Sequence, residues 1–419
     1  MKSRPSLHIH SAAAHLLRLA WKNIWRNKLR SGVILFAITL GLYAGIFVAS
    51  FANGMVNQLI EDTINIEVTH LQINRESFIN MGGLHDTFSQ EPLETQVKAI
   101  PNVMGVSPRL IMNVSASTSH RMGSVQLICI DPEKEKMVSA LYKTIADSLG
   151  SYFGTTTPNC IVVGSKFAEK FKVSLGKKVV LSLTDHAGEP FSAAFRIGGI
   201  YQTNNPGLDE IKVYANINDL RKLCSFPQDS IHELAIRLKN NDAAVCDSAK
   251  AEVAKLLSKG EIVRTWAEIN PVIAMYNGFM DTIFTIVIII ILFALGFGIV
   301  NTVLMSVMER RRELNMLMAI GMNRSRVMTL IITESTILTM LGGFLGIFLG
   351  ILTVYIKGKT GIDMSSSISS YSVIGISSLI YPVISLKQCV QIVIMVILTG
   401  ILSAIYPARV AVKNKILNL

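Results

Sequence analysis

Four long apolar runs dominate the pattern of hydrophobic and polar positions along the chain. They cover residues 31–53, 279–308, 327–356 and 388–408. A transmembrane helix needs about 20 predominantly apolar residues, and each run reaches that length. The first run contains no charged residue, and the third is interrupted only by Glu334. The pattern therefore predicts four transmembrane helices.

Residues 364–386 form a further uncharged stretch, which we do not predict to be a fifth span. Nine of these residues are Ser, and Pro382 interrupts the stretch. A fifth span would also place the basic C-terminal tail on the opposite side of the membrane from the other basic segments. Residues 357–387 are therefore predicted to be a loop on the outer side.

Basic residues cluster beside the predicted spans. Residues 1–30 carry seven basic and no acidic residues, the loop over residues 309–326 carries five Arg, and residues 409–419 carry three basic residues. Lys and Arg are enriched in loops on the cytoplasmic side of a membrane. We therefore expect these three segments in the cytoplasm and residues 54–278 on the outer, periplasmic side.

The composition agrees with a membrane protein that carries a water-exposed domain. Only 16% of the residues are charged, whereas a soluble domain has about 25%. The net charge of +11 does not indicate nucleic-acid binding, because residues 54–278 hold 22 Lys and Arg against 24 Asp and Glu. The remaining chain holds 18 against 5, and most of that excess lies at the ends of apolar runs. We expect no nucleic-acid partner.

Short strand-like and helix-like patterns alternate within residues 54–278. Strands are predicted over residues 68–74, 126–130, 160–163, 178–183, 194–200, 212–214 and 233–238. Helices are predicted over residues 93–99, 135–148, 165–171, 217–223 and 243–258. The expected fold is an α-helical membrane protein with four transmembrane helices and a large α+β domain inserted between helices 1 and 2.

No catalytic or metal-binding motif is complete. His232 and Glu233 begin a zinc-protease pattern, but Ile236 stands where the second His is required. Residues 358–360 resemble the end of a phosphate-binding loop whose first glycine is replaced by Thr353. We therefore predict no catalytic residue and no metal site, and we do not expect this chain to be an enzyme.

Three motifs flank the spans. They are a basic amphipathic segment at residues 19–30, a charged segment at residues 308–314 followed by 319–322 and 334–335, and residues 406–409. Together with the order of one span, a large insert and three spans, these motifs resemble the FtsX-like permease family, the MacB and Lol type of ABC transporter subunit. The resemblance covers essentially the whole chain.

In that family, the loop between the second and third spans docks on a separate ATPase. The resemblance assigns this coupling to Glu309, Arg310, Arg312, Glu313, Met316, Ala319 and Gly321. It also implies that ATP and Mg²⁺ bind to the cytosolic ATPase and that this chain carries no cofactor. The alternative interpretation is that Arg311, Arg324 and Arg326 only anchor the topology. The loop departs from the commonest family pattern at Asn315 and Met318, which are usually Gly and Arg.

Smaller features resemble the lipoprotein-releasing Lol permeases. They are residues 53–54, 70–73, 130–135 and 263–266. This resemblance implies a dimer with a second copy or a homologous permease, in the inner membrane of a bacterial cell. It also implies that the cargo is a lipoprotein, which mechanotransmission releases from the outer leaflet without passage through the bilayer. A periplasmic carrier is then expected to receive the lipoprotein. MacB-like tripartite efflux, or an FtsX-like relay that activates a cell-wall hydrolase, are the alternatives.

Several residues within the spans have two interpretations. Phe47, Phe51, Met55 and Phe284 are candidate contacts for the acyl chains of the cargo, but ordinary packing against membrane lipids or other helices is the more common use of such residues. Gly342, Gly346 and Gly350 are predicted to allow close helix packing within the chain. Glu334 is either functional or paired with a nearby Arg or Lys.

Overall fold

The computed structural model describes residues 18–26, 28–153, 158–364 and 379–413. These residues divide into two compact units. The helical bundle comprises residues up to 55, 278–362 and from 380 onward, and the inserted domain comprises residues 56–277 with 363 and 364 and with 379.

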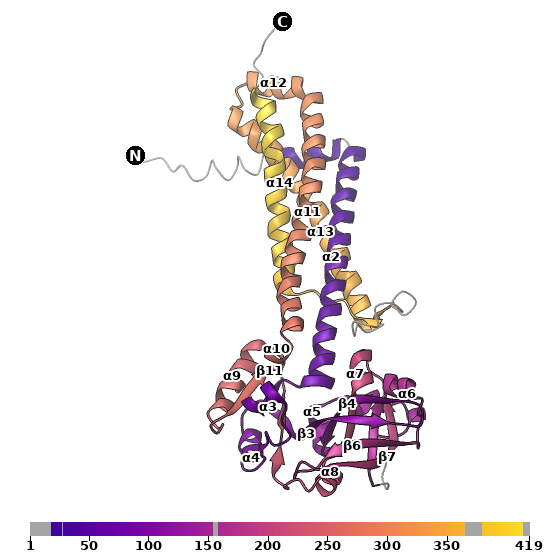
Figure 1. Cartoon of the computed structure of the whole chain (residues 1–419). Helices are drawn as coiled ribbons and strands as arrows, with labels where there is room; N and C mark the ends of the chain where they lie inside the picture. The colour runs from indigo at the N-terminus through magenta and orange to yellow at the C-terminus, as the bar shows by residue number, and fades with distance from the viewer. Residues whose placement is uncertain (1–17, 27, 154–157, 365–378, 414–419) are drawn as a thin grey trace. The chain divides into compact units, whose positions relative to one another are not determined.

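Four long helices make up most of the helical bundle. They are α2 (Lys28–Asp62), α11 (Pro271–Glu309), α13 (Arg324–Thr360) and α14 (Leu386–Lys413), and they run alongside one another (Figure 1). Within the described residues, these four helices are long and apolar enough to cross a membrane. The prediction of four spans is confirmed. Each helix extends beyond its apolar run.

Small residues of α13 allow it to lie directly against α2. A Cβ atom added at Gly346 would lie 2.9 Å from the carbonyl oxygen of Thr39, and one added at Gly350 would lie 2.9 Å from Cγ2 of Ile46. Gly342 meets Ile38 of α2 in the same way. The row of glycines therefore serves packing between two helices of the same chain, as the sequence predicts.

The segment that precedes α14 also packs against α2. The backbone N–H of Val383 donates a 3.0 Å hydrogen bond to the carbonyl oxygen of Ser50, and a Cβ atom added at Gly54 would overlap the carbonyl oxygen of Tyr381. Residues 381–385 are not helical. Part of the stretch 364–386 that we considered as a fifth span lies outside the described residues.

A nine-stranded mixed sheet organises the inserted domain, in the order β11-β1-β10-β3-β4-β8-β5-β7-β6. Its strands are β1 (Leu71–Arg75), β3 (Val103–Ser117), β4 (Met122–Ile130), β5 (Cys160–Gly164), β6 (Lys178–Thr184), β7 (Pro190–Tyr201), β8 (Lys212–Asn216), β10 (Glu233–Leu238) and β11 (Glu261–Thr265). The pairs β4–β8 and β5–β7 are parallel. The inserted α and β domain therefore follows the first span, as predicted.

Short helices cover the sheet. They are α3 (Glu76–Met81), α4 (Leu93–Lys98), α5 (Pro132–Val138), α6 (Ser165–Phe171), α7 (Pro206–Ile211), α8 (Ile217–Leu223), α9 (Ala243–Ala254) and α10 (Trp266–Ile269). Phe167 and Phe171 of α6 stack with their ring centroids 4.3 Å apart in one core cluster. Val253 of α9 packs with Leu71 and Ile236 in a second cluster. The domain thus has more than one hydrophobic centre along its sheet.

Three local predictions in the inserted domain are wrong. The predictions omit the longest strand, β3, which contains Pro108, although proline is normally confined to edge strands, strand starts and bulges. The helix predicted over residues 135–148 ends at Val138, because the backbone N–H of Ala140 is drawn to the carbonyl oxygen of Asn65 at 2.7 Å. The strand predicted from residue 68 begins at Leu71, after a π-helical turn over Thr63–Val68.

Candidate functional site

The charged loop between the second and third spans folds into a short helix, α12 (Arg311–Ala319). Arg310 is the single residue between α11 and α12, with φ −95° and ψ 12°. At the other end, the N–H of Met322 bonds the carbonyl oxygen of Leu317 at 3.0 Å, and the N–H of Gly321 bonds that of Met318 at 3.1 Å. This is a Schellman ending, and Gly321 occupies its left-handed position with φ +106°. Gly321 therefore ends α12 in a tight turn before α13.

One side of α12 is buried against the long helices. Leu314 is 4% exposed and packs in a cluster with Val307, Val327, Ile331 and Ala408, which come from α11, α13 and α14. Burial of this side holds the short helix, because a nine-residue helix is only marginally stable by itself. In Figure 1, α12 lies at one end of the bundle, across the direction of the long helices.

The opposite side of α12 faces outward. Met316 is 57% exposed and Ile320, just beyond the helix, is 78% exposed. Arg312 lies four residues before Met316, so that these three side chains follow one face of the helix. Arg311 and Ala319 are also exposed. The outward face, which we name the α12 face, consists of Arg311, Arg312, Met316, Ala319 and Ile320.

A chain of ion pairs ties α12 to the other elements. Nη2 of Arg26 lies 2.8 Å from Oε1 of Glu313, Nε of Arg310 lies 3.4 Å from Oε2 of Glu313, and Nη1 of Arg310 lies 3.3 Å from both carboxylate oxygens of Glu334. The Arg26 guanidinium beside Glu313 lowers the pKa of that carboxyl below its ordinary 4.5. The side chains of Arg310 and Glu334 are only 14% and 22% exposed.

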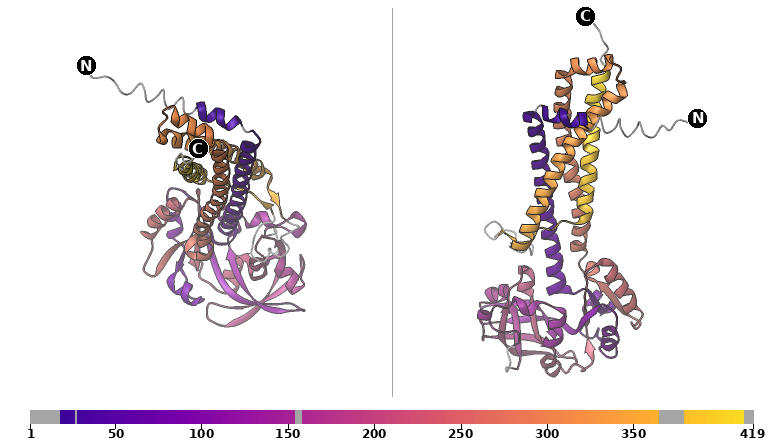
Figure 2. Two further views of the ribbon diagram at one scale, coloured as in Figure 1. Left: turned by 90° about the horizontal axis from the view of Figure 1, so that it is seen from above. Right: turned by 180° about the vertical axis from the view of Figure 1, so that it is seen from behind.

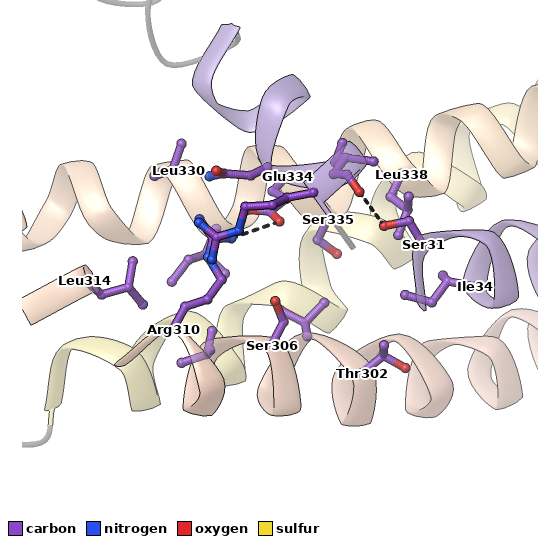
Figure 3. Close-up of a pocket in the computed structure, with 16 residues that line it drawn as sticks. Ser31, Ile34, Thr302, Ser306, Arg310, Leu314, Leu330, Glu334, Ser335 and Leu338 are labelled. Atoms are coloured by element: carbon purple, nitrogen blue, oxygen red, sulfur yellow. Dashed lines mark hydrogen bonds and ion pairs between the residues drawn. The ribbon is translucent and has the colours of Figure 1, made fainter. Parts of the chain in front are cut away.

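A cavity of about 60 Å³ lies beside the inner part of this chain. Arg310 and Glu334 point toward each other and form part of its wall, together with Ser306 and Ser335 (Figure 3). The hydroxyl of Ser31 also lines the cavity and donates a 2.7 Å hydrogen bond to the carbonyl oxygen of Ile24. The ion pair therefore borders a chamber that polar and apolar side chains line together.

The N-terminal helix (residues 18–26) completes the site. It runs across the direction of the long helices (Figure 2). Ala20 and Ile24 are buried, whereas Trp21 and Trp25 are about half exposed and contact each other edge to face at 6.0 Å. Arg26, at the end of this helix, carries the ion pair to α12.

Two known protein families match segments of this chain, one in each unit for the greater part. The family described as the FtsX-like permease C-terminal region matches residues 285–416, and the MacB-like periplasmic core domain matches residues 31–256, more than half of the chain. The chain belongs to the FtsX/MacB type of ABC transporter permease.

Individual relatives are distant. The macrolide export ATP-binding/permease protein MacB of Rhodopirellula baltica is 26% identical over 45% of this chain, which spans only 26% of that relative's length. The lipoprotein-releasing system transmembrane protein LolC of Buchnera aphidicola is 23% identical over 95% of both chains. The periplasmic region of MacB from Actinobacillus actinomycetemcomitans is 12% identical, covers 52% of this chain and 98% of that one, and has a TM-score of 0.34.

In this permease, the residues predicted to contact an ATPase divide into two groups. Met316, Ala319 and Arg312 lie on the α12 face, and Glu309 and Gly321 are exposed at its two ends. Arg310 and Glu313 do not belong to that face, because both are engaged in the ion-pair chain.

The sequence identified neither Arg26 as the partner of Glu313 nor Arg310 as the partner of Glu334. Its expectation that Glu334 could pair with an Arg or Lys agrees with the structure. The spacing of 24 residues between Arg310 and Glu334 leaves no local pattern, although two opposite charges at the same end of neighbouring spans are a usable signal.

The predicted acyl-chain contacts also divide. Phe284 is 4% exposed and lies in the core of the helical bundle with Ile46 and Ile288, so it offers no surface to a cargo and the expectation for it is corrected to internal packing. Phe47 and Phe51 of α2 are half-buried, as is Met55.

In the inserted domain, the residues that resemble part of a zinc-protease motif make structural contacts instead. His232 is fully buried; its Nδ1 accepts from the backbone N–H of Ile111 at 3.1 Å, and its Nε2 lies 3.0 Å from the carbonyl oxygen of Leu84. Glu233 pairs with Nη1 of buried Arg109 at 2.8 Å. Over the described part of the chain, no three His, Cys, Asp or Glu side chains are grouped to hold a metal ion.

Proposed function

We propose that this permease is driven by a separate ATPase subunit that docks on the α12 face. The observation that carries the proposal is the outward pair Met316 and Ile320, which follows Arg312 on a helix whose other side is buried. Exposed apolar side chains rimmed by charge mark an interaction surface. The occupant is a protein with an apolar groove and acidic residues at its edge.

The charge distribution supports a cytoplasmic position for α12. Basic residues precede α2, flank α12 and follow α14, and the cytoplasmic ends of spans carry such residues. In this arrangement both termini are cytoplasmic in a bacterial inner membrane, and the inserted domain is periplasmic. ATP and Mg²⁺ bind to the ATPase, and the permease contributes no catalytic residue. It acts as a dimer, with a second copy or with a homologous permease.

The proposed cargo is a lipoprotein, extracted from the outer leaflet of the inner membrane and passed to a periplasmic carrier. The match to LolC supports this choice, because it extends over 95% of both chains, whereas the match to MacB spans 26% of that protein. ATP-driven movement passes through α12 to the spans and the inserted domain, and the cargo does not cross the bilayer. Phe47, Phe51 and Met55 are the proposed acyl-chain contacts.

Docking is tested by purifying the full-length protein from the membrane with whatever ATPase it retains. The Met316→Asp and Ile320→Asp variants place a charge on the α12 face and are expected to lose the ATPase. Met81→Asp is the matched control, because Met81 is 85% exposed in the inserted domain. An ATPase retained equally by all three variants would exclude the α12 face as its docking surface. If the unaltered chain retains no ATPase, the proposed function is wrong.

The cargo is tested with the assembled complex in membrane vesicles that contain acylated lipoproteins. ATP-dependent release of a lipoprotein to a soluble carrier is the expected result. Co-purification with an adaptor and an outer-membrane channel would instead favour MacB-like efflux. Retention of a cell-wall hydrolase without lipid cargo would favour an FtsX-like relay.

A further inference from the structure

Arg310 joins three elements through one side chain. It occupies the bend between α11 and α12, and its guanidinium lies 3.4 Å from Glu313 of α12 and 3.3 Å from Glu334 of α13. Any rotation of α12 about this bend moves Arg310 and Glu313, whereas Glu334 is fixed to the third span. We infer that the Arg310–Glu334 pair transmits movement of α12 to α13. This inference rests on the proposed docking of an ATPase on the α12 face.

Stability alone does not account for this pair. An ionised side chain within a span is costly and marks a functional position by default. Well-packed apolar residues often replace a buried ion pair without loss of stability. If Arg310 and Glu334 only held α13 against the bend, apolar residues would stabilise this contact as well as the ion pair does.

The cavity beside the pair gives it room to rearrange. A pocket of about 60 Å³ lies beside the pair, and its lining includes Ser306, Ser335 and Thr302 as well as apolar side chains of the same helices. A pocket of this size has room for water, which needs about 10–15 Å³ per molecule, beside the hydroxyl groups of its lining. Water beside the guanidinium allows Arg310 to shift without leaving a charge unsolvated.

The structure describes one arrangement of Glu313, and the inference requires a second. In the arrangement described, both carboxylate oxygens of Glu313 accept from Arg26, at 2.8 and 3.0 Å, and its contact with Arg310 is longer, at 3.4 Å. Movement of α12 that separates Glu313 from Arg310 leaves the guanidinium on Glu334 alone. In this inference Arg310 is either shared between two carboxylates, as in the structure, or bound to Glu334 alone, and coupling between sites requires an element with two such states.

The test separates docking from transmission in the full-length complex. Arg310→Gln and Glu334→Gln are expected to retain the ATPase as well as the unaltered chain. ATP-driven release of cargo is expected to fall at least about fivefold, the lower end of ordinary coupling between sites. Arg409→Gln is the matched control, because Arg409 is an exposed arginine of α14 outside this site. Thermal melting of each variant in detergent shows whether it is folded.

A charge exchange provides the decisive variant. The double variant Arg310→Glu with Glu334→Arg restores an ion pair with the two charges exchanged. It is expected to release more cargo than either charge reversal alone. Loss of the ATPase from the Gln variants would make Arg310 a docking residue, and unaltered release would show that the pair transmits nothing. A double variant no better than the worse single variant would also overturn the inference. Failure of the unaltered chain to bind an ATPase would instead remove the proposed function itself.

Discussion

Arg26 and Glu313 lie 287 positions apart in sequence and are joined by two hydrogen bonds of 2.8 and 3.0 Å. Arg26 ends the N-terminal helix, and Glu313 lies in the first turn of α12. The pair therefore fixes the segment that precedes the first span to the short helix between the second and third spans. Both side chains are about half exposed, so their interaction is open to solvent, salt and protons.

This ion pair is expected to stabilise the fold only while Glu313 is ionised. Arg26 lowers the pKa of Glu313 in the folded protein below its ordinary 4.5. The stabilisation is therefore complete above pH 4.5 and is lost as the pH falls through the lowered pKa. Thermal melting of the unaltered chain and of Glu313→Gln in detergent should differ at neutral pH and converge in acid. A difference that is independent of pH would show that the carboxylate charge is not the cause.

Gly346 is expected to tolerate no side chain. An added Cβ atom would lie 2.9 Å from the carbonyl oxygen of Thr39 and from Cβ of Leu42, and overpacking of this kind costs about 1–3 kcal/mol. Gly346→Val should therefore lower the thermal stability of the protein in detergent. Gly298→Val is the matched control in α11, where an added Cβ atom meets nothing within 4 Å. Equal effects of the two changes would contradict the packing of α13 on α2.

The contact between α2 and the segment before α14 is expected to depend on Gly54. A side chain at Gly54 would overlap the carbonyl of Tyr381 and lie 2.9 Å from Cα of Pro382, so Gly54→Ala must displace this segment. Nearby, Nδ2 of Asn53 donates a 3.0 Å hydrogen bond to Oε1 of Gln388. A disulfide between cysteines introduced at Ser50 and Val383 should form in the unaltered background and form less in Gly54→Ala. The same yield in both backgrounds would refute the steric argument.

His232 is expected to make the inserted domain sensitive to acid. Burial lowers the pKa of His232 from 6.5 to about 4, so the unfolded chain binds a proton between these pH values that the folded chain does not. Stability is therefore lost as the pH falls from 6.5 to about 4, by roughly 3 kcal/mol at 1.4 kcal/mol per pH unit.

Unfolding of the full-length protein at several pH values checks this prediction. His232→Asn should be less stable at neutral pH and should lose less of its remaining stability on acidification. His120→Asn, which changes an exposed histidine, should follow the unaltered chain. A pH profile of His232→Asn as steep as that of the unaltered chain would assign the acid sensitivity to other groups.

Features that depend on local composition could be predicted from the amino-acid sequence. The four spans follow from the length of the apolar runs, because a bilayer imposes a minimum length on any helix that crosses it. The turn at Gly321 follows from one residue, because only glycine readily adopts φ +106° at the end of a helix. The place of the inserted domain follows from the change in composition after residue 54.

Which charged residues face outward and which form ion pairs depends on how the helices pack together. Arg310 and Arg312 are indistinguishable in the sequence, yet one is bound to Glu334 and the other is exposed on the α12 face. The strand β3 formed despite Pro108, because β10 pairs with its first half and β4 with its second half, so that Pro108 has a strand partner on one side only. Partners far apart in sequence leave no periodic pattern, so their pairing is fixed only when the helices and strands pack together.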